Sequence, residues 1–251
     1  MTAEKSKKGV KISYKDLQLL IGLSGIAFPF VLVIGYWINN WLFGNGDGFQ
    51  FVFRGSLSSY YYTPMRNVFV GTLVTVGIFL IVYIGYPSEE DNRLGNWAGF
   101  LVIVTALAPT SEHGAKKVPE NYIHLTAASI FFILLAYYCL VLFRRTDQPL
   151  LNPPLPTGLI QRIFAEAIRT PKFQDEVSNQ NKIKRNRIYK FCGWIIVCSI
   201  MMSVTLYFVD RYVVNLAKTN FALYLESINS EAFGVAWVVK SEKWFWKDKI
   251  I

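Results

Sequence analysis

The chain has 251 residues, of which 53% are hydrophobic and only 17% are charged, and its net charge is +9. A typical soluble domain has about 25% charged residues, so this composition argues against a soluble protein and favours a membrane protein. The three cysteines lie in apolar runs and match neither a CxxC metal motif nor a disulfide framework, so we expect them to pack as small apolar side chains.

Six apolar stretches predict an all-α fold, a polytopic transmembrane bundle of six helices, because a membrane-spanning helix needs about 20 mainly apolar residues. The whole chain, 1–251, is expected to form a single membrane domain. In chain order, the expected helices lie at about residues 17–43, 68–86, 95–111, 122–143, 190–210 and 219–240. The last of these stretches is the least apolar, because it contains Glu226 and Glu231.

The distribution of lysine and arginine predicts the orientation of these helices. With the N-terminus in the cytoplasm, twenty of the 26 Lys and Arg residues fall in inner segments and six fall in outer segments. Both termini are therefore expected to be cytoplasmic, in a bacterial inner membrane. The basic charge then faces the anionic inner leaflet, so the lipid bilayer is the expected partner and nucleic acid is not.

The first outer segment ends in SLSSYYYTPMRN, residues 56–67. Tyrosines are typical of a membrane interface, because the ring is apolar and the hydroxyl is polar, so an aromatic belt explains the three tyrosines. A belt does not explain the serines and the arginine beside them. The residues of this stretch that we expect at the rim of a binding site are Ser58, Ser59, Tyr60, Tyr61, Tyr62 and Arg66.

Other ionisable residues are predicted at the same outer level. His124 lies about one turn into the fourth expected helix, and Glu226 and Glu231 lie inside the sixth. An ionisable group in a membrane helix costs roughly 2.5–3.5 kcal/mol, so it usually faces a cavity or a partner. Glu226 is either a structural partner of Arg66 or Arg211, or part of a ligand, ion or proton site. His124 is either a structural hydrogen-bonding residue, or a metal ligand or acid–base group.

A metal site and a serine nucleophile are weaker alternatives. A zinc site would need His113 and His124 together with carboxylates such as Glu112, but the chain has only two histidines and no HExxH motif. No metal or other cofactor is therefore expected. Ser58 or Ser59 with His124 would suit serine chemistry, although no GxSxG motif surrounds either serine.

The segment 144–189 is expected to be a cytoplasmic loop. Its residues 158–170 carry apolar side chains at helical spacing, which predicts a short helix lying in the inner membrane interface; a helix that docks a protein partner through 144–190 is the alternative. The basic run KIKRNRIYK, residues 182–190, predicts a topology anchor, with binding of anionic lipid headgroups as a further possibility.

Several motifs carry a family resemblance. SYYYTPMRNVFVG, DNRLGNWAG, ALAPT and HLTAASIFF together resemble a group of uncharacterised bacterial multi-pass membrane proteins. Residues 92–143 more distantly resemble the DUF998 and Frag1/DRAM/Sfk1-type six-helix proteins. The resemblance implies a six-helix bundle and no particular chemistry. Within DNRLGNWAG, Gly95 and Gly99 form a GxxxG pattern, which favours close helix packing.

We therefore expect an outward-facing polar pocket that binds a lipid headgroup or small ligand, in a sensor or an accessory subunit. Two alternatives use the same outer residues: a membrane-embedded lipid hydrolase with a metal, and a proton- or ion-coupled transporter that uses Glu226 and Glu231. The lack of a clear inverted repeat in the sequence argues slightly against transport.

Overall fold

The computed structural model describes residues 13–44, 51–83, 89–110, 119–145, 180–212 and 220–244. Within these residues the regular structure is entirely helical, as the all-α prediction requires. The α-helices are α1 (Tyr14–Phe43), α2 (Arg66–Val82), α3 (Glu89–Leu107), α4 (Pro119–Leu140), α6 (Gln180–Tyr212) and α7 (Phe221–Lys240). Two short 3-10 helices are η1 (Ser58–Tyr62) and η2 (Leu142–Arg144).

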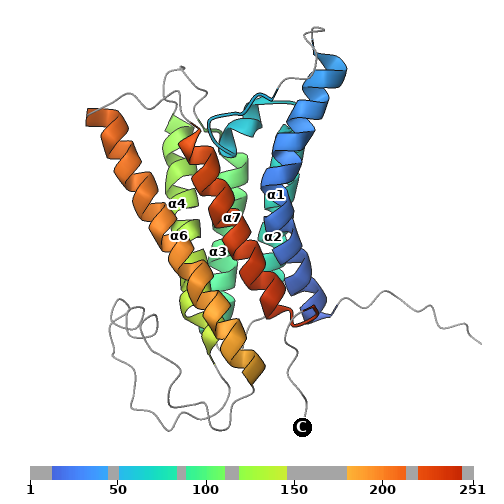
Figure 1. Cartoon of the computed structure of the whole chain (residues 1–251), viewed down its shortest axis with the longest axis vertical. Helices are drawn as coiled ribbons and strands as arrows, with labels where there is room; N and C mark the ends of the chain where they lie inside the picture. The colour runs from blue at the N-terminus through green and yellow to red at the C-terminus, as the bar shows by residue number, and fades with distance from the viewer. Residues whose placement is uncertain are drawn as a thin grey trace, which may run out of the picture.

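The six described α-helices stand side by side and close a ring (Figure 1). Around this ring, α1 packs on α7, α7 on α6, α6 on α4, α4 on α3, α3 on α2, and α2 back on α1. The start of α1 and the end of α7 meet at the lower end of the view, and η1 lies at the upper end. Each helix therefore has one face toward the interior of the ring and one toward its surroundings.

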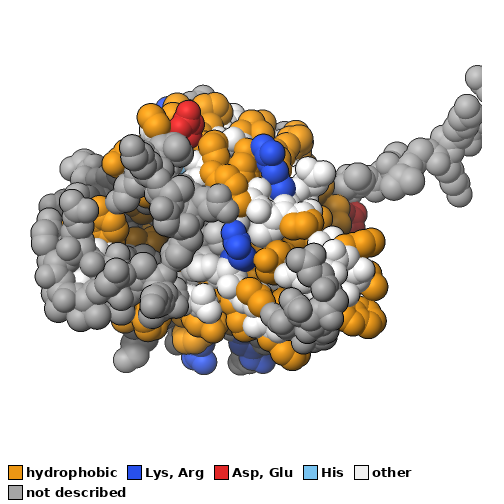
Figure 2. Space-filling view, turned by 90° about the horizontal axis from the view of Figure 1, so that it is seen from above, with side chains coloured by type: hydrophobic (Ala, Val, Ile, Leu, Met, Phe, Trp, Pro, Cys, Tyr) orange, Lys and Arg blue, Asp and Glu red, His pale blue; other side chains and the backbone are white. Residues whose placement is uncertain are grey.

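Three described helical segments are long and apolar enough to cross a membrane: Tyr14–Phe43, Pro119–Arg144 and Asn181–Val209. α2 is apolar but has only 17 residues, and α3 begins with the polar sequence EEDNR. Large apolar side chains are exposed on the outside of the ring, among them Trp41, Trp97 and Phe191. Seen from the η1 end, orange apolar side chains lie around the rim of the molecule (Figure 2). Such a surface is typical of a protein surrounded by lipid.

The helix starts differ from the expected bounds. α6 begins at Gln180 rather than near 190, so the basic run 182–190 is part of the helix instead of leading into it. Lysine and arginine are good helix formers, which explains why this run continues the helix. α3 begins at Glu89 rather than near 95. The expected interfacial helix at 158–170 lies outside the described residues, as does the segment 146–179 around it.

Two glycine seams hold neighbouring helices close together. A Cβ atom added to Gly234 of α7 would lie 2.6 Å from the carbonyl oxygen of Gly22 in α1. A Cβ added to Gly99 of α3 would lie 2.4 Å from the carbonyl oxygen of Gly77 in α2. Contacts this close leave no room for a side chain. At Gly99 they support the close packing expected from the GxxxG pattern, as does Gly95, which faces the carbonyl oxygen of Leu80.

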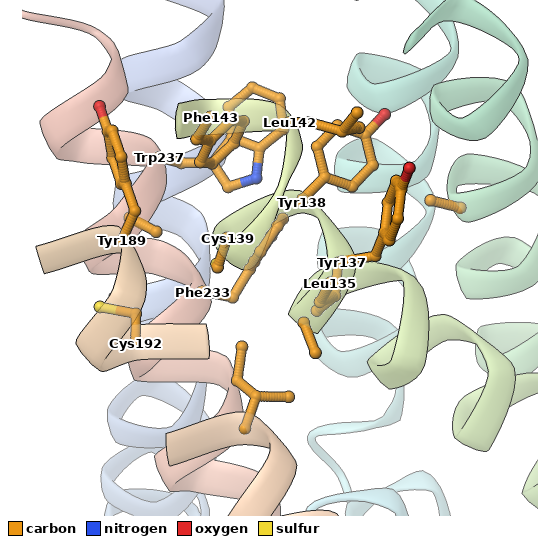
Figure 3. Close-up of a cluster of buried hydrophobic side chains, with 14 of the residues drawn as sticks. Leu135, Tyr137, Tyr138, Cys139, Leu142, Phe143, Tyr189, Cys192, Phe233 and Trp237 are labelled. Carbon is orange, nitrogen blue, oxygen red and sulfur yellow. The ribbon is translucent and has the colours of Figure 1, made fainter. Parts of the chain in front are cut away.

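The aromatic core, drawn close up in Figure 3, surrounds Trp237 near the end of α7, which lies at the lower end of the ring in Figure 1. Trp237 of α7 is fully buried, and its ring centroid lies 4.8 Å from that of Tyr83, 5.1 Å from that of Phe143 and 5.8 Å from that of Phe233. These rings come from α7, from η2 and from the residue after α2. Edge-on contacts of this kind add to the free energy gained from burial. Large aromatic side chains therefore pack together at the lower end among the residues that the structure describes.

An ionic cluster joins three chain segments at the same lower end. Glu242, just after α7, accepts a hydrogen bond from Lys15 at 2.8 Å and forms an ion pair with Arg185 at 3.1 Å. Lys243 pairs with Asp16, whose carboxylate also accepts a hydrogen bond from the Ser13 backbone in the capping box of α1. The start of α1, the start of α6 and the end of α7 are thus fixed to one another.

Candidate functional site

A pocket of about 90 Å³ opens inside the ring beneath η1, with walls from α1, α2, α3, α4 and α7. Five phenylalanines line it, so most of its wall is apolar. One water molecule occupies about 30 Å³ of liquid, and pockets for drug-sized ligands measure about 300–1,000 Å³. The pocket therefore fits a small group or one end of a longer molecule. Its titratable lining residues are His124 and Glu226, and hydroxyl residues that include Ser58 line it as well.

The 3-10 helix η1 is held in place by contacts within its own sequence and by α7. The backbone N–H of Ser59 donates to Ser56 Oγ at 3.1 Å, and the backbone N–H of Ser56 donates to Ser59 Oγ at 3.2 Å. These serine contacts stabilise the turn that starts η1. They leave the N–H groups of Leu57 and Ser58 to find other partners.

Glu226 of α7 supplies those partners. Its Oε2 atom accepts hydrogen bonds from the backbone N–H of Leu57 at 2.8 Å and of Ser58 at 3.3 Å. In return, the N–H of Leu223 at the start of α7 donates to the carbonyl of Gly55 at 3.0 Å. A carboxylate on one helix thus caps another, and each segment satisfies backbone groups that the other leaves open.

Of the alternatives that the sequence left open for Glu226, pairing with Arg66 is not seen in the structure. The Arg66 guanidinium donates to the hydroxyl of Tyr61 at 2.6 Å and lies 4.3 Å from the centre of the Tyr61 ring. The other expected partner, the side chain of Arg211, lies outside the described residues. Both hydrogen bonds to Glu226 end on Oε2, and Oε1 has no hydrogen-bond partner among the described residues.

The three tyrosines of η1 fix this short helix and do not line the pocket. Tyr60 is fully buried and packs edge-on against Tyr36 with ring centroids 5.6 Å apart. Burial raises the pKa of the Tyr60 phenol above its ordinary value, so this hydroxyl stays neutral. The Tyr62 hydroxyl donates to the carbonyl of Thr110, just beyond α3. These contacts tie η1 to α1 and to the end of α3.

His124 has both a structural contact and a place in the pocket. Its side chain is buried, and its Nδ1 lies 2.9 Å from the carbonyl oxygen of Ala108. A carbonyl oxygen only accepts hydrogen bonds, so Nδ1 is the donor. Two residues after Ala108, Thr110 donates to the side-chain oxygen of Asn121 at 3.1 Å. Asn121 lies about one turn before His124 in α4. The start of α4 is therefore tied to the end of α3, and the imidazole is held at the pocket wall.

The structure brings together only some of the residues expected at the site. Ser58, His124 and Glu226 share the pocket, although they come from three separate segments. The expected site residues that do not line it are Ser59, Tyr60, Tyr61, Tyr62, Arg66 and Glu231. Glu112 and His113 lie outside the described residues, and no three His, Cys, Asp or Glu side chains in the described part are grouped to hold a metal.

Sequence reasoning missed the polar groups that α1 and the middle of α7 contribute. Ser24 and Ser230 both line the pocket, and Ser230 Oγ donates to the carbonyl of Gly25 at 2.7 Å. The available signal was a serine close to a glycine in each helix, since Ser24 precedes Gly25 in α1 and Ser230 lies about one turn before Gly234 in α7. Small residues with hydroxyls mark helix faces that pack closely and hydrogen-bond across an interface.

No family model, no curated protein and no solved structure matches this chain. Its function therefore has to be argued from the pocket and from the surface of the ring.

Proposed function

We propose that the chain is an integral membrane protein whose pocket beneath η1 binds the polar end of a lipid or a small ligand of similar size. The protein acts as a sensor or accessory subunit. One observation carries this proposal: Ser58, His124 and Glu226 line one pocket, and Oε1 of Glu226 has no hydrogen-bond partner among the described residues. A polar atom in an apolar pocket gains most from a ligand that supplies its missing hydrogen bond.

The lining of the pocket indicates the chemistry of its ligand. A carboxyl oxygen such as Oε1 accepts a hydrogen bond, so the ligand presents a hydroxyl or an amine there. The phenylalanine walls favour an apolar group next to that donor. The volume of about 90 Å³ limits the buried part to a few heavy atoms, so the rest of a longer ligand would lie outside.

The proposed topology has six membrane crossings with both termini in the cytoplasm of a bacterium. Three segments have the length and composition of membrane spans, and the three shorter helices stand beside them in the same ring (Figure 1). The excess of Lys and Arg in the expected inner segments supports this orientation. The pocket then opens toward the outer side, because η1 lies at the end opposite the start of α1.

A lipid hydrolase is the second candidate, because Ser58 and His124 line the same pocket. The lack of a contact between Ser58 and His124 in the described part of the chain favours binding over catalysis, although the Nδ1 contact to Ala108 does not itself occupy Nε2. Ser58 Oγ lies 3.0 Å from Ser56 Oγ, and the Nδ1 atom of His124 donates to Ala108. Catalysis by these residues needs a hydrogen bond between the serine and the histidine, and the described residues contain none.

Native mass spectrometry of the protein released from nanodiscs tests the proposal. We expect wild type to retain a small ligand or a specific lipid that Ala128→Phe excludes by filling the pocket and Glu226→Gln weakens. Ser129→Phe is the matched control, because Ser129 is exposed on the same helix and does not line the pocket. A bare polypeptide, or equal retention in all four proteins, would refute ligand binding. A bound metal that is lost in His124→Ala would favour the hydrolase.

A further inference from the structure

A second, larger hollow lies on the outer face of the ring. This groove of about 500 Å³ has α4 between α3 and α6, and α4 packs against both. Several side chains along it are well exposed, including Trp97 at 60%, Ile133 at 54% and Met201 at 65%. None of its lining residues belongs to the pocket beneath η1. The groove therefore faces the surroundings of the protein rather than its interior.

The groove is long enough to hold about two thirds of an acyl chain within one leaflet. Along α4 it extends from Leu140, near the lower end, to Ile133. Seven residues of helix rise about 10 Å, and the hydrocarbon region of one leaflet is about 15 Å deep. The volume lies in the range of about 300–1,000 Å³ that binds sizeable ligands. Apart from the Tyr137 hydroxyl and the Trp97 indole N–H, the side chains of the walls are apolar except at one place.

That place is Arg93, the one charged residue among the described residues that line the groove. Arg93 is exposed, and its guanidinium pairs with none of the side chains that the structure describes. It lies in the first two turns of α3, one turn from Trp97. Tryptophan prefers the membrane interface, so this pair marks the level of the lipid headgroups. A guanidinium there matches the geometry of a phosphate.

We propose that this groove binds one phospholipid with an anionic headgroup, its phosphate at Arg93 and one acyl chain along α4. A partner helix fits less well, because membrane helices associate through small residues, and Trp97, Ile133 and Met201 here are large. The proposal depends on the protein being embedded in a membrane. It is independent of any ligand in the pocket beneath η1.

The experiment uses nanodiscs of equimolar phosphatidylglycerol and phosphatidylcholine, with the retained lipid identified by native mass spectrometry. Wild type is expected to retain phosphatidylglycerol in preference. Arg93→Gln should lower that retention at least five-fold, and Arg93→Lys less. Arg187→Gln is the matched control, because Arg187 is an exposed arginine near the same end of the ring that does not line the groove.

A second pair of variants tests the groove itself. Ile133→Trp should block it and lower retention of phosphatidylglycerol, whereas Ile130→Trp, an exposed position on the same helix outside the groove, should not. Retention in Ala128→Phe should equal wild type, which separates this site from the pocket beneath η1. Equal retention of the two lipids by wild type would overturn the proposal. So would a loss in Arg93→Gln without one in Ile133→Trp, because headgroup attraction alone would explain it.

Discussion

The side chain of Glu226 and the backbone N–H of Leu57 form a 2.8 Å hydrogen bond between residues 169 positions apart in the sequence. This contact joins η1 to α7 at the upper end of the ring and is matched by the contact from Leu223 to Gly55. The same carboxyl group thus holds η1 with Oε2, and we propose that its Oε1 binds a ligand. Its structural and binding roles can be separated by substitution.

Glu226→Ala is expected to destabilise the protein by about 1–3 kcal/mol, because two backbone N–H groups lose their acceptor in a part-buried place. Glu226→Gln keeps a side-chain oxygen at the same position and should cost much less. Thermal unfolding in detergent, followed by tryptophan fluorescence, measures both. If the two variants lose the same free energy of unfolding, the hydrogen bonds from η1 to Glu226 do not account for the stabilisation at this position.

Gly99→Ala is expected to destabilise the protein by about 1–3 kcal/mol, because the new methyl group would meet the Gly77 carbonyl and force α2 and α3 apart. Gly71→Ala is the control on α2, since a Cβ there has nothing within 4 Å. Alanine is the better helix former by about 0.5–1 kcal/mol, so the control should be neutral or slightly stabilising. The same unfolding assay measures both variants. Equal effects of the two substitutions would contradict the prediction that close packing of α2 and α3 requires glycine at position 99.

Glu242→Gln is expected to cost about 1.5–3 kcal/mol, whereas Lys15→Gln should cost less than about 1 kcal/mol. The difference arises from burial, since the side chain of Arg185 is only 5% exposed and that of Lys15 is 55% exposed. The Lys15 contribution should also fade in high salt, because exposed charges are screened. Unfolding curves at low and high salt test this, and equal losses at Lys15 and Glu242 would show that burial does not decide the contribution.

The helical content was readable from the sequence because apolar runs of about 20 residues dominate it. The residues at which the helices start were harder to predict. Hydropathy locates a membrane span by its apolar residues, so it places the start of a helix after the last charged residue. At the start of α6 the basic run 182–190 is helical although it is charged. Helix formation and burial in lipid are separate properties, and hydropathy reports only the second.

Part of the candidate site could also be predicted from the pattern of apolar and charged residues. Ionisable residues in apolar helices point to cavities, and this rule found His124 and Glu226. The rule did not identify the partner of Glu226. This side chain accepts hydrogen bonds from backbone N–H groups, and because every residue except proline has such a group, the sequence does not show which one is the partner. The tyrosines were misleading candidates. A tyrosine side chain, with its apolar ring and polar hydroxyl, suits a membrane interface, but Tyr60 packs inside the protein. Only three-dimensional packing distinguishes these cases.

The proposed orientation predicts which positions a membrane-impermeant maleimide reaches in intact cells. In a variant with its three native cysteines replaced by alanine, Lys116→Cys lies in an expected outer segment and should be labelled. Lys7→Cys lies in the expected inner leader and should be labelled only after the cells are opened. Twenty of the 26 Lys and Arg residues lie on the expected inner side, and the positive-inside rule makes this arrangement the stable one. Labelling of Lys7→Cys in intact cells would reverse the orientation and turn the pocket beneath η1 toward the cytoplasm.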